Sequence, residues 1–133
     1  MRRPERVPLM DLNRIVLIGN MVRDPEEKEL ASGQTLTRFS LATNYAWTDT
    51  QTKAKRETVD YHDIVAWGKL GEIIAQYVKK GAKVYIEGRL RNRSFVGKDG
   101  QKRTKPEIVA ENMIMLGHKT PRQAAVAPEE PEE

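Results

Sequence analysis

Alternation of apolar and polar residues dominates the chain and predicts a protein built mostly of strands. Five segments are rich in alternating, β-branched or aromatic residues: 12–19, 35–47, 58–67, 83–95 and 102–116. Such segments are typical of strands with at least one buried face. The first segment is apolar at nearly consecutive positions, so we expect both of its faces to be buried.

One segment follows a helical period instead. Its apolar residues are spaced by three, one, three and one positions, which is the stripe of an amphipathic helix: Leu70, Ile73, Ile74, Tyr77 and Val78. Gly81 is well placed to end this helix, behind Lys79 and Lys80, which suit the negative end of the helix dipole. No capping residue marks where the helix starts.

The predicted order is three strands, one helix and two strands. It predicts an all-β fold with one helix between strands three and four, as in the five-stranded, partly open oligonucleotide-binding (OB-fold) barrel. An open α+β layer with one covering helix is the alternative. We expect a flexible N-terminus at 1–10 and this domain at 11–117. Residues 118–133 are rich in alanine, proline and glutamate, which predicts a disordered acidic C-terminal tail.

Composition excludes several classes of chemistry. The 133 residues include no cysteine, which excludes disulfides, thiolate catalysis and cysteine-based metal sites. The basic N-terminus lacks the apolar region of a secretory signal, and no segment approaches the ~18 apolar residues of a membrane span. We therefore expect a cytoplasmic protein without membrane contact.

Positive charge is concentrated in one predicted hairpin. The formal net charge is +4, and the tail carries four closely spaced glutamates, so the body is more basic than the average suggests. Residues 89 to 105 include one anion, Asp99, and seven cations: Arg89, Arg91, Arg93, Lys98, Lys102, Arg103 and Lys105. We interpret this run as a track for nucleic-acid phosphates. The alternative is a charged sheet edge that prevents aggregation. Four further candidates for phosphate contact lie elsewhere: Lys53, Lys55, Arg56 and Lys69.

Four aromatic residues are candidates for base stacking: Trp47, Tyr61, Trp67 and Phe95. Tyr61 and Trp67 are six residues apart in one predicted strand and therefore share a face. Exposed rings beside cations bind single-stranded nucleic acid without reading its sequence, because every base has a face that can stack. Each ring could instead belong to the core, and Trp67 is the most ambiguous, because Val65 shares its face.

Several segments resemble the bacterial single-stranded DNA-binding protein family in order and spacing, over residues 12 to 117: RIVLIGNMVRDPE, FSLATNYAW, TVDYHDIVAWGKLGE, YVKKGAKVYIEGRLRNRSF and KDGQKR. The resemblance implies an OB-fold barrel that assembles as a homotetramer and protects single-stranded DNA during replication, recombination and repair, in the cytoplasm and associated with the nucleoid. It places Trp47, Tyr61, Trp67 and Phe95 on the aromatic platform of the family. Tyr61 and Phe95 replace the tryptophans often found there. His62 falls on a position associated with assembly.

The C-terminal end departs from the family pattern. Members usually end in an acidic tip with terminal hydrophobic residues, which recruits replication and repair enzymes. Here the sequence ends in PEEPEE, without an apolar anchor. We therefore do not expect this tail to recruit such enzymes specifically.

Two other functional classes are alternatives. An enzyme would need a cluster such as Asp60, His62 and Asp63, but neighbouring side chains of a strand point to opposite faces. The sequence contains no GxSxG, P-loop or GxGxxG motif. We expect no catalysis and no cofactor. An adaptor that binds protein through the same barrel stays open, and RNA is not excluded as a ligand, since stacking tolerates a 2′-hydroxyl.

Overall fold

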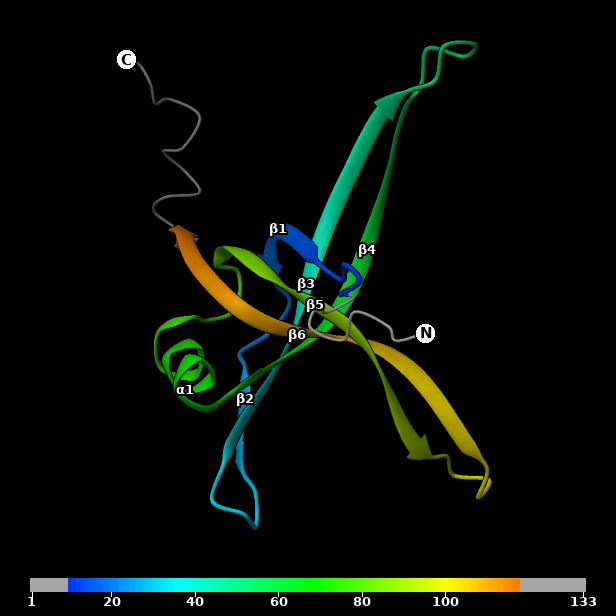
Figure 1. The fold of residues 1–133 in the computed structure, drawn as a ribbon. Helices are drawn as coiled ribbons and strands as arrows, with labels where there is room; N and C mark the ends of the chain where they lie inside the picture. Colours follow the sequence, from blue (N-terminus) through cyan, green and yellow to red (C-terminus); the bar gives the residue numbers. More distant parts are fainter. Residues whose placement is uncertain (1–9, 118–133) are drawn as a thin grey trace, which may run out of the picture.

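Five long strands and one short strand form a single sheet in the computed structural model, which describes residues 10–117. The elements are β1 (Ile15–Met21), β2 (Glu26–Glu29), β3 (Thr35–Thr48), β4 (Lys55–Trp67), α1 (Gly68–Tyr77), β5 (Lys83–Val96) and β6 (Lys102–Gly117). The strand order is β1-β5-β6-β4-β3-β2, and β1 also pairs with β3, which closes the long strands into a barrel (Figure 1). The expected five-stranded barrel, with its helix between the third and fourth long strands, is confirmed. The expected N-terminal segment before Met10 and the acidic tail at 118–133 lie outside the described residues.

The short strand β2 is an element that the sequence pattern does not predict. Its four residues, EEKE, are all exposed and pair with β3 at the edge of the sheet. An edge strand without a buried face has no alternation of apolar and polar residues to detect. Charged residues on such an edge also discourage pairing with another chain.

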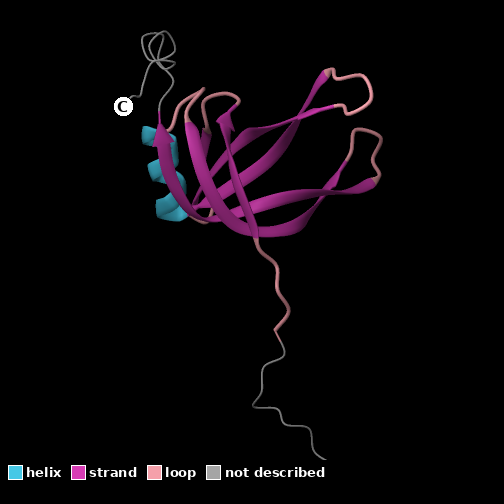
Figure 2. Cartoon of the chain, turned by 90° about the horizontal axis from the view of Figure 1, so that it is seen from above, coloured by secondary structure: helices cyan, strands magenta, loops and turns pink. Residues whose placement is uncertain are grey.

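Alternate residues of the long strands point into the barrel and form its core. Leu41, Ile64 and Ile86 are fully buried there, α1 adds Ile74, and Val78 directly after the helix is also buried. The helix lies at one end of the barrel, and the β3–β4 and β5–β6 hairpins project from the other end (Figure 2). The core thus occupies only the part of each long strand that is nearer the helix.

The helix differs in two respects from its sequence prediction. It ends at Tyr77, and Gly81 lies beyond it in a turn, with a positive φ of 87°. Its apolar stripe is only half buried, because Ile74 and Val78 pack on the core whereas Ile73 and Tyr77 are exposed. A helix that covers the end of a narrow barrel contacts it along a line, which leaves the margins of the stripe in solvent.

Within a single chain, the first strand is buried on one face only, not on both faces as expected. Ile15 and Leu17 pack against the core, but Val16 and Ile18 are 52% and 53% exposed. The strand pairs with β5 along most of its length and with β3 only at Asn20 and Met21. Nothing within residues 10–117 covers its outward side chains.

Closure of the barrel depends on a close approach at Gly19. A Cβ atom at this position would lie 2.6 Å from the carbonyl oxygen of Ala42 and 3.2 Å from Cγ2 of Thr43, both in β3. We predict that Gly19→Ala lowers the free energy of unfolding in urea by about 1–3 kcal/mol, because β1 must move away from β3. Gly117→Ala is the control, since its Cβ would meet no atom within 4 Å. Equal stability of the two variants would contradict this account of closure.

Candidate nucleic-acid interface

One exterior surface of the barrel gathers most of the candidate binding residues. The register aligns Arg38 with Val65, Val65 with Val109, and Arg91 with Glu107, so the outward residues of β3, β4, β6 and β5 share a surface. We call this surface the outer face and define it by these residues: Arg38, Ser40, Tyr61, Asp63, Trp67, Arg89, Arg91, Arg93, Phe95, Arg103, Lys105 and Glu107.

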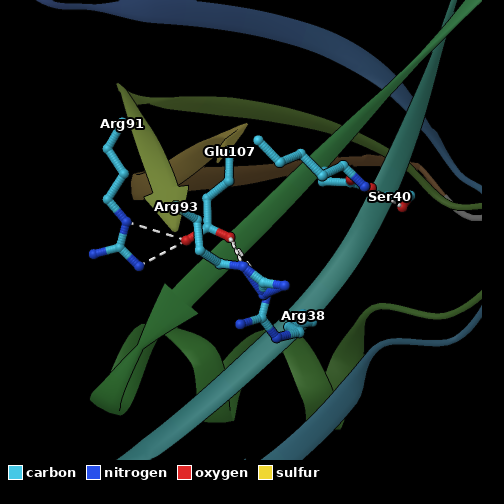
Figure 3. A network of polar contacts seen from close by, with 7 residues as sticks. Arg38, Ser40, Arg91, Arg93 and Glu107 are labelled. Carbon is cyan, nitrogen blue, oxygen red and sulfur yellow. Dashed lines mark hydrogen bonds and ion pairs between the residues drawn. The ribbon is translucent and has the colours of Figure 1, made fainter. Parts of the chain in front are cut away.

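A buried carboxylate lies at the centre of the outer face. Glu107 is 4% exposed, and its Oε2 accepts hydrogen bonds from Nε (3.1 Å) and Nη2 (2.6 Å) of Arg91. Its Oε1 accepts a hydrogen bond from Nη1 of Arg38 at 3.3 Å and lies 4.0 Å from Nε of Arg93. Figure 3 shows the arginine side chains converging on Glu107. One anion from β6 therefore orients guanidinium groups of β3 and β5 at the surface.

A hollow of about 260 Å³ opens beside this carboxylate. Its lining includes basic, acidic and uncharged residues: Arg23, Glu26, Arg38, Phe39, Ser40, Asp63, Ile64, Arg93, Lys105 and Glu107. Within it, Nζ of Lys105 lies 2.7 Å from Oδ2 of Asp63, and Oγ of Ser40 donates to Oδ1 at 3.1 Å. The hydrogen bond from Lys105 is the main reason that the pKa of Asp63 lies below its ordinary value. Asp63 is therefore ionised at neutral pH and offsets the charge of Lys105.

The basic track predicted from the sequence is largely ion-paired. Glu107 and Glu111 of β6, which follow the counted residues 89–105, and Asp63 of β4 supply anions that this count does not include. Arg89 lies 3.4 Å from Glu111, and the exposed pair of Arg103 with Asp99 is 2.5 Å long. Exposed pairs of this kind contribute little stability, so a phosphate can replace the carboxylate.

The remaining cations are spread over the hairpins and the helix. Within residues 10–117, these lysines have no acidic partner at ion-pair distance: Lys53, Lys55, Lys69, Lys98 and Lys102. Lys102 is aligned with Val96, so it points away from the outer face, and Lys69 lies in the first turn of α1. The structure therefore places neither of these two on the outer face, and Arg56, which is aligned with Trp47, also points away from it.

Three of the four predicted rings lie on the outer face. Tyr61 is 67% exposed, and the guanidinium carbon of Arg93 lies 5.3 Å from the ring centroid of Phe95, which is partly exposed. Trp67 is also partly exposed and packs against Leu36, Val65 and Val109. Trp67 therefore agrees in part with both predictions made for it: it packs on a small apolar cluster, as a core residue would, and it still lies at the surface.

Trp47, the fourth predicted ring, does not share the outer face. Trp47 is aligned with Arg56, whereas Tyr61 is aligned with Ala42, and this register sends the two rings to opposite sides of the β3–β4 hairpin. Trp47 is 41% exposed and packs beside Tyr45, an exposed ring that was not among the predicted candidates. The alternation in NYAW was the available signal for Tyr45.

His62 belongs to neither a metal centre nor an acid–base cluster in this structure. Its Nε2 lies 2.8 Å from Oγ1 of Thr43. Asp60 shares its side of β4, whereas Asp63 points to the outer face. Among residues 10–117, no group of three or more histidine, aspartate or glutamate side chains is arranged to hold a metal ion.

The one helix among residues 10–117, α1, is not long and apolar enough to span a membrane.

A second region of the exterior is apolar. Val16, Ile18, Ile114 and Leu116 are each about half exposed on β1 and β6. Tyr85 of β5 lies between them, aligned with both Ile18 and Ile114. We call these five residues the β1 patch.

Comparisons with known proteins identify similar sequences and a similar fold. The model of the single-strand binding protein family matches residues 12–116. "Single-stranded DNA-binding protein 1" of Chlorobaculum tepidum is 49% identical over 109 residues, which are 81% of this chain and 67% of that protein. "Single-stranded DNA-binding protein" of Neisseria meningitidis is 44% identical over 108 residues, which are 81% of this chain and 62% of that protein. The chain thus spans about two thirds of the length of these relatives. A solved structure titled "Plasmodium falciparum SSB complex with ssDNA" superposes with a TM-score of 0.74 at 32% identity, covering 83% of this chain and 99% of that one.

Glu107 provides a test of how the outer face is held together. We predict that Glu107→Gln lowers the free energy of unfolding by about 1–3 kcal/mol, because the arginines lose their shared buried anion. Asp99→Asn is the control: it removes an exposed pair with Arg103 and should change stability by less than about 1 kcal/mol. Urea denaturation of both variants measures the difference. If Glu107→Gln is as stable as Asp99→Asn, the carboxylate does not organise this surface.

Proposed function

The chain belongs to the single-strand binding protein family, and from this premise we propose that it binds single-stranded DNA without reading the base sequence. In this proposal, bases stack on exposed rings while lysine and arginine side chains pair with phosphates. The observation that carries the proposal is the exposed ring of Tyr61 on the same face as Phe95 and the arginines around Glu107. An exposed ring beside cations can stack on a base while the cations pair with phosphates, whereas a ring of the folded core would be buried among apolar side chains.

Stacking and phosphate contacts on the outer face supply enough free energy for binding that does not depend on the base sequence. Each stacked base contributes roughly 1–3 kcal/mol, so several rings together with a few phosphate contacts reach useful affinity after ordering is subtracted. Phosphates would replace the exposed carboxylate partners of residues such as Arg89 and Arg103. When a phosphate replaces a carboxylate in this way, the arginine is solvated or paired with an anion both in the free protein and in the complex.

The cellular role follows from this binding mode. We propose that the protein covers and protects single strands exposed during replication, recombination and repair, in the cytoplasm and at the nucleoid. Rings and cations alone do not distinguish DNA from RNA, and we propose DNA because the relatives are named single-stranded DNA-binding proteins. We propose no catalytic step.

The β1 patch supports assembly with further copies of the chain, and we propose the homotetramer of the family resemblance. Its apolar residues are contiguous across three strands, which is typical of a homomeric interface and unusual for a surface that faces water. His62, the other residue predicted to take part in assembly, lies outside this patch, and its role stays a prediction.

Removal of the exposed tyrosine tests the stacking surface. We predict that Tyr61→Ala weakens binding to a labelled oligo-dT by about 1–3 kcal/mol, measured by fluorescence anisotropy. Tyr77→Ala is the control, because Tyr77 is also exposed but lies on α1, at the other end of the barrel.

The salt dependence of binding is a second test. For the wild-type protein, the logarithm of the affinity for oligo-dT should fall with the logarithm of the salt concentration, with a slope of about 0.7 per phosphate neutralised. An affinity that does not change with salt would favour the protein-binding adaptor.

A charge placed in the apolar patch tests assembly. We predict that Ile18→Glu reduces the sedimentation mass from tetramer to smaller species, because a buried carboxylate at the interface would lack a partner. Ile73→Glu introduces the same charge at an exposed position of α1 and should leave the mass unchanged. An unchanged mass for Ile18→Glu would remove the β1 patch as the assembly surface.

A further inference from the structure

Two exposed rings occupy the side of the β3–β4 hairpin that faces away from Tyr61. Tyr45 and Trp47 are two residues apart on β3, and they are 65% and 41% exposed. Their centroids lie 5.6 Å apart and their planes are inclined by 31°. This separation falls within the range of aromatic pairs in mutual contact, so no base fits between them. The pair instead presents one continuous aromatic surface to solvent.

A cation lies across the hairpin from this aromatic surface. Arg56 of β4 is aligned with Trp47 and therefore projects to the same side of the hairpin. Its nearest acidic partner, Asp49, is 3.8 Å away, and its side chain is 54% exposed. The guanidinium group thus keeps donors free for a phosphate while the rings beside it are free for bases.

The neighbours of the pair are polar, which argues against a protein partner here. The residues aligned with Tyr45 and with Thr43 on the same side are Thr58 and Asp60. An interface between proteins needs a contiguous apolar centre, as the β1 patch has, and two rings bordered by threonine, aspartate and arginine do not supply one. Stacking of bases needs only rings with a cation beside them.

We propose that Tyr45 is a stacking residue for single-stranded DNA and forms, with Trp47 and Arg56, a second binding surface on the side of the hairpin opposite the outer face. This inference rests on the proposed function and adds a residue and a surface to it. The bound DNA strand would then contact both sides of the β3–β4 hairpin, which projects from the barrel (Figure 1). Tyr61 lies on one side of this hairpin and the Tyr45–Trp47 pair on the other. The hairpin can be contacted on both sides because its outer half extends beyond the core.

The test compares three substitutions of Tyr45. Tyr45→Ala should weaken binding to oligo-dT about fivefold or more, the lower limit for one stacked base. Tyr45→Phe keeps the ring and should bind within about twofold of the wild type. Tyr45→Leu keeps an apolar contact with Trp47 but has no ring, so it should bind as weakly as Tyr45→Ala. Anisotropy of the labelled oligonucleotide supplies the affinities, and Tyr77→Ala is again the exposed control.

Each outcome decides between stacking and another role. Full affinity of Tyr45→Leu would mean that Tyr45 only supports Trp47, and a reduced sedimentation mass of Tyr45→Ala would mean that the pair contacts a second copy. Either result overturns the inference. If the wild type binds oligo-dT and Tyr61→Ala weakens it, but Tyr45→Ala binds normally, the inference fails alone. If the wild type does not bind oligo-dT, the proposed function fails.

Discussion

The buried carboxylate of Glu107 is the interaction on which the order of the outer face depends. Arginines on neighbouring strands repel one another, and long side chains without a partner sample many rotamers. Glu107 of β6 accepts hydrogen bonds from Arg91 of β5 and Arg38 of β3, so one anion links three strands of the barrel. Each of these arginines stays partly exposed while its position is restricted. The protein can therefore present a cationic surface whose geometry exists before any ligand arrives.

The length of the hairpins determines where the aromatic residues lie. The core fills the barrel near α1, and β3 and β4 continue well past it. Tyr45 and Trp47 follow the same alternation as the buried residues Phe39 and Leu41 of β3, but at their level of the hairpin no opposite wall covers them, whereas Tyr61 points to the outer face. A residue type that usually adds to the core is thereby exposed, and both sides of the projecting ribbon carry a ring that a base can reach.

The exterior of the barrel divides into surfaces with different chemistry. The β1 patch is apolar and continuous, which suits a second copy of the chain. The outer face combines rings with cations and carboxylates, which suits a flexible polyanion with flat bases. The two surfaces consist of different residues on different parts of the barrel wall. The proposed self-association and the proposed nucleic-acid binding therefore do not compete for the same side chains.

The sequence by itself determined the long strands, the helix between them and the shared face of Tyr61 and Trp67, because side-chain direction within one strand depends only on parity. It also predicted the rings and cations as residue types. Only the tertiary structure decided that Trp47 and Tyr61 point to opposite sides, that the track is ion-paired, and that Val16 and Ile18 are uncovered. These features depend on the register and neighbours of each strand. A shift of one residue would reverse a face, and the pattern along a single strand contains nothing that specifies that shift.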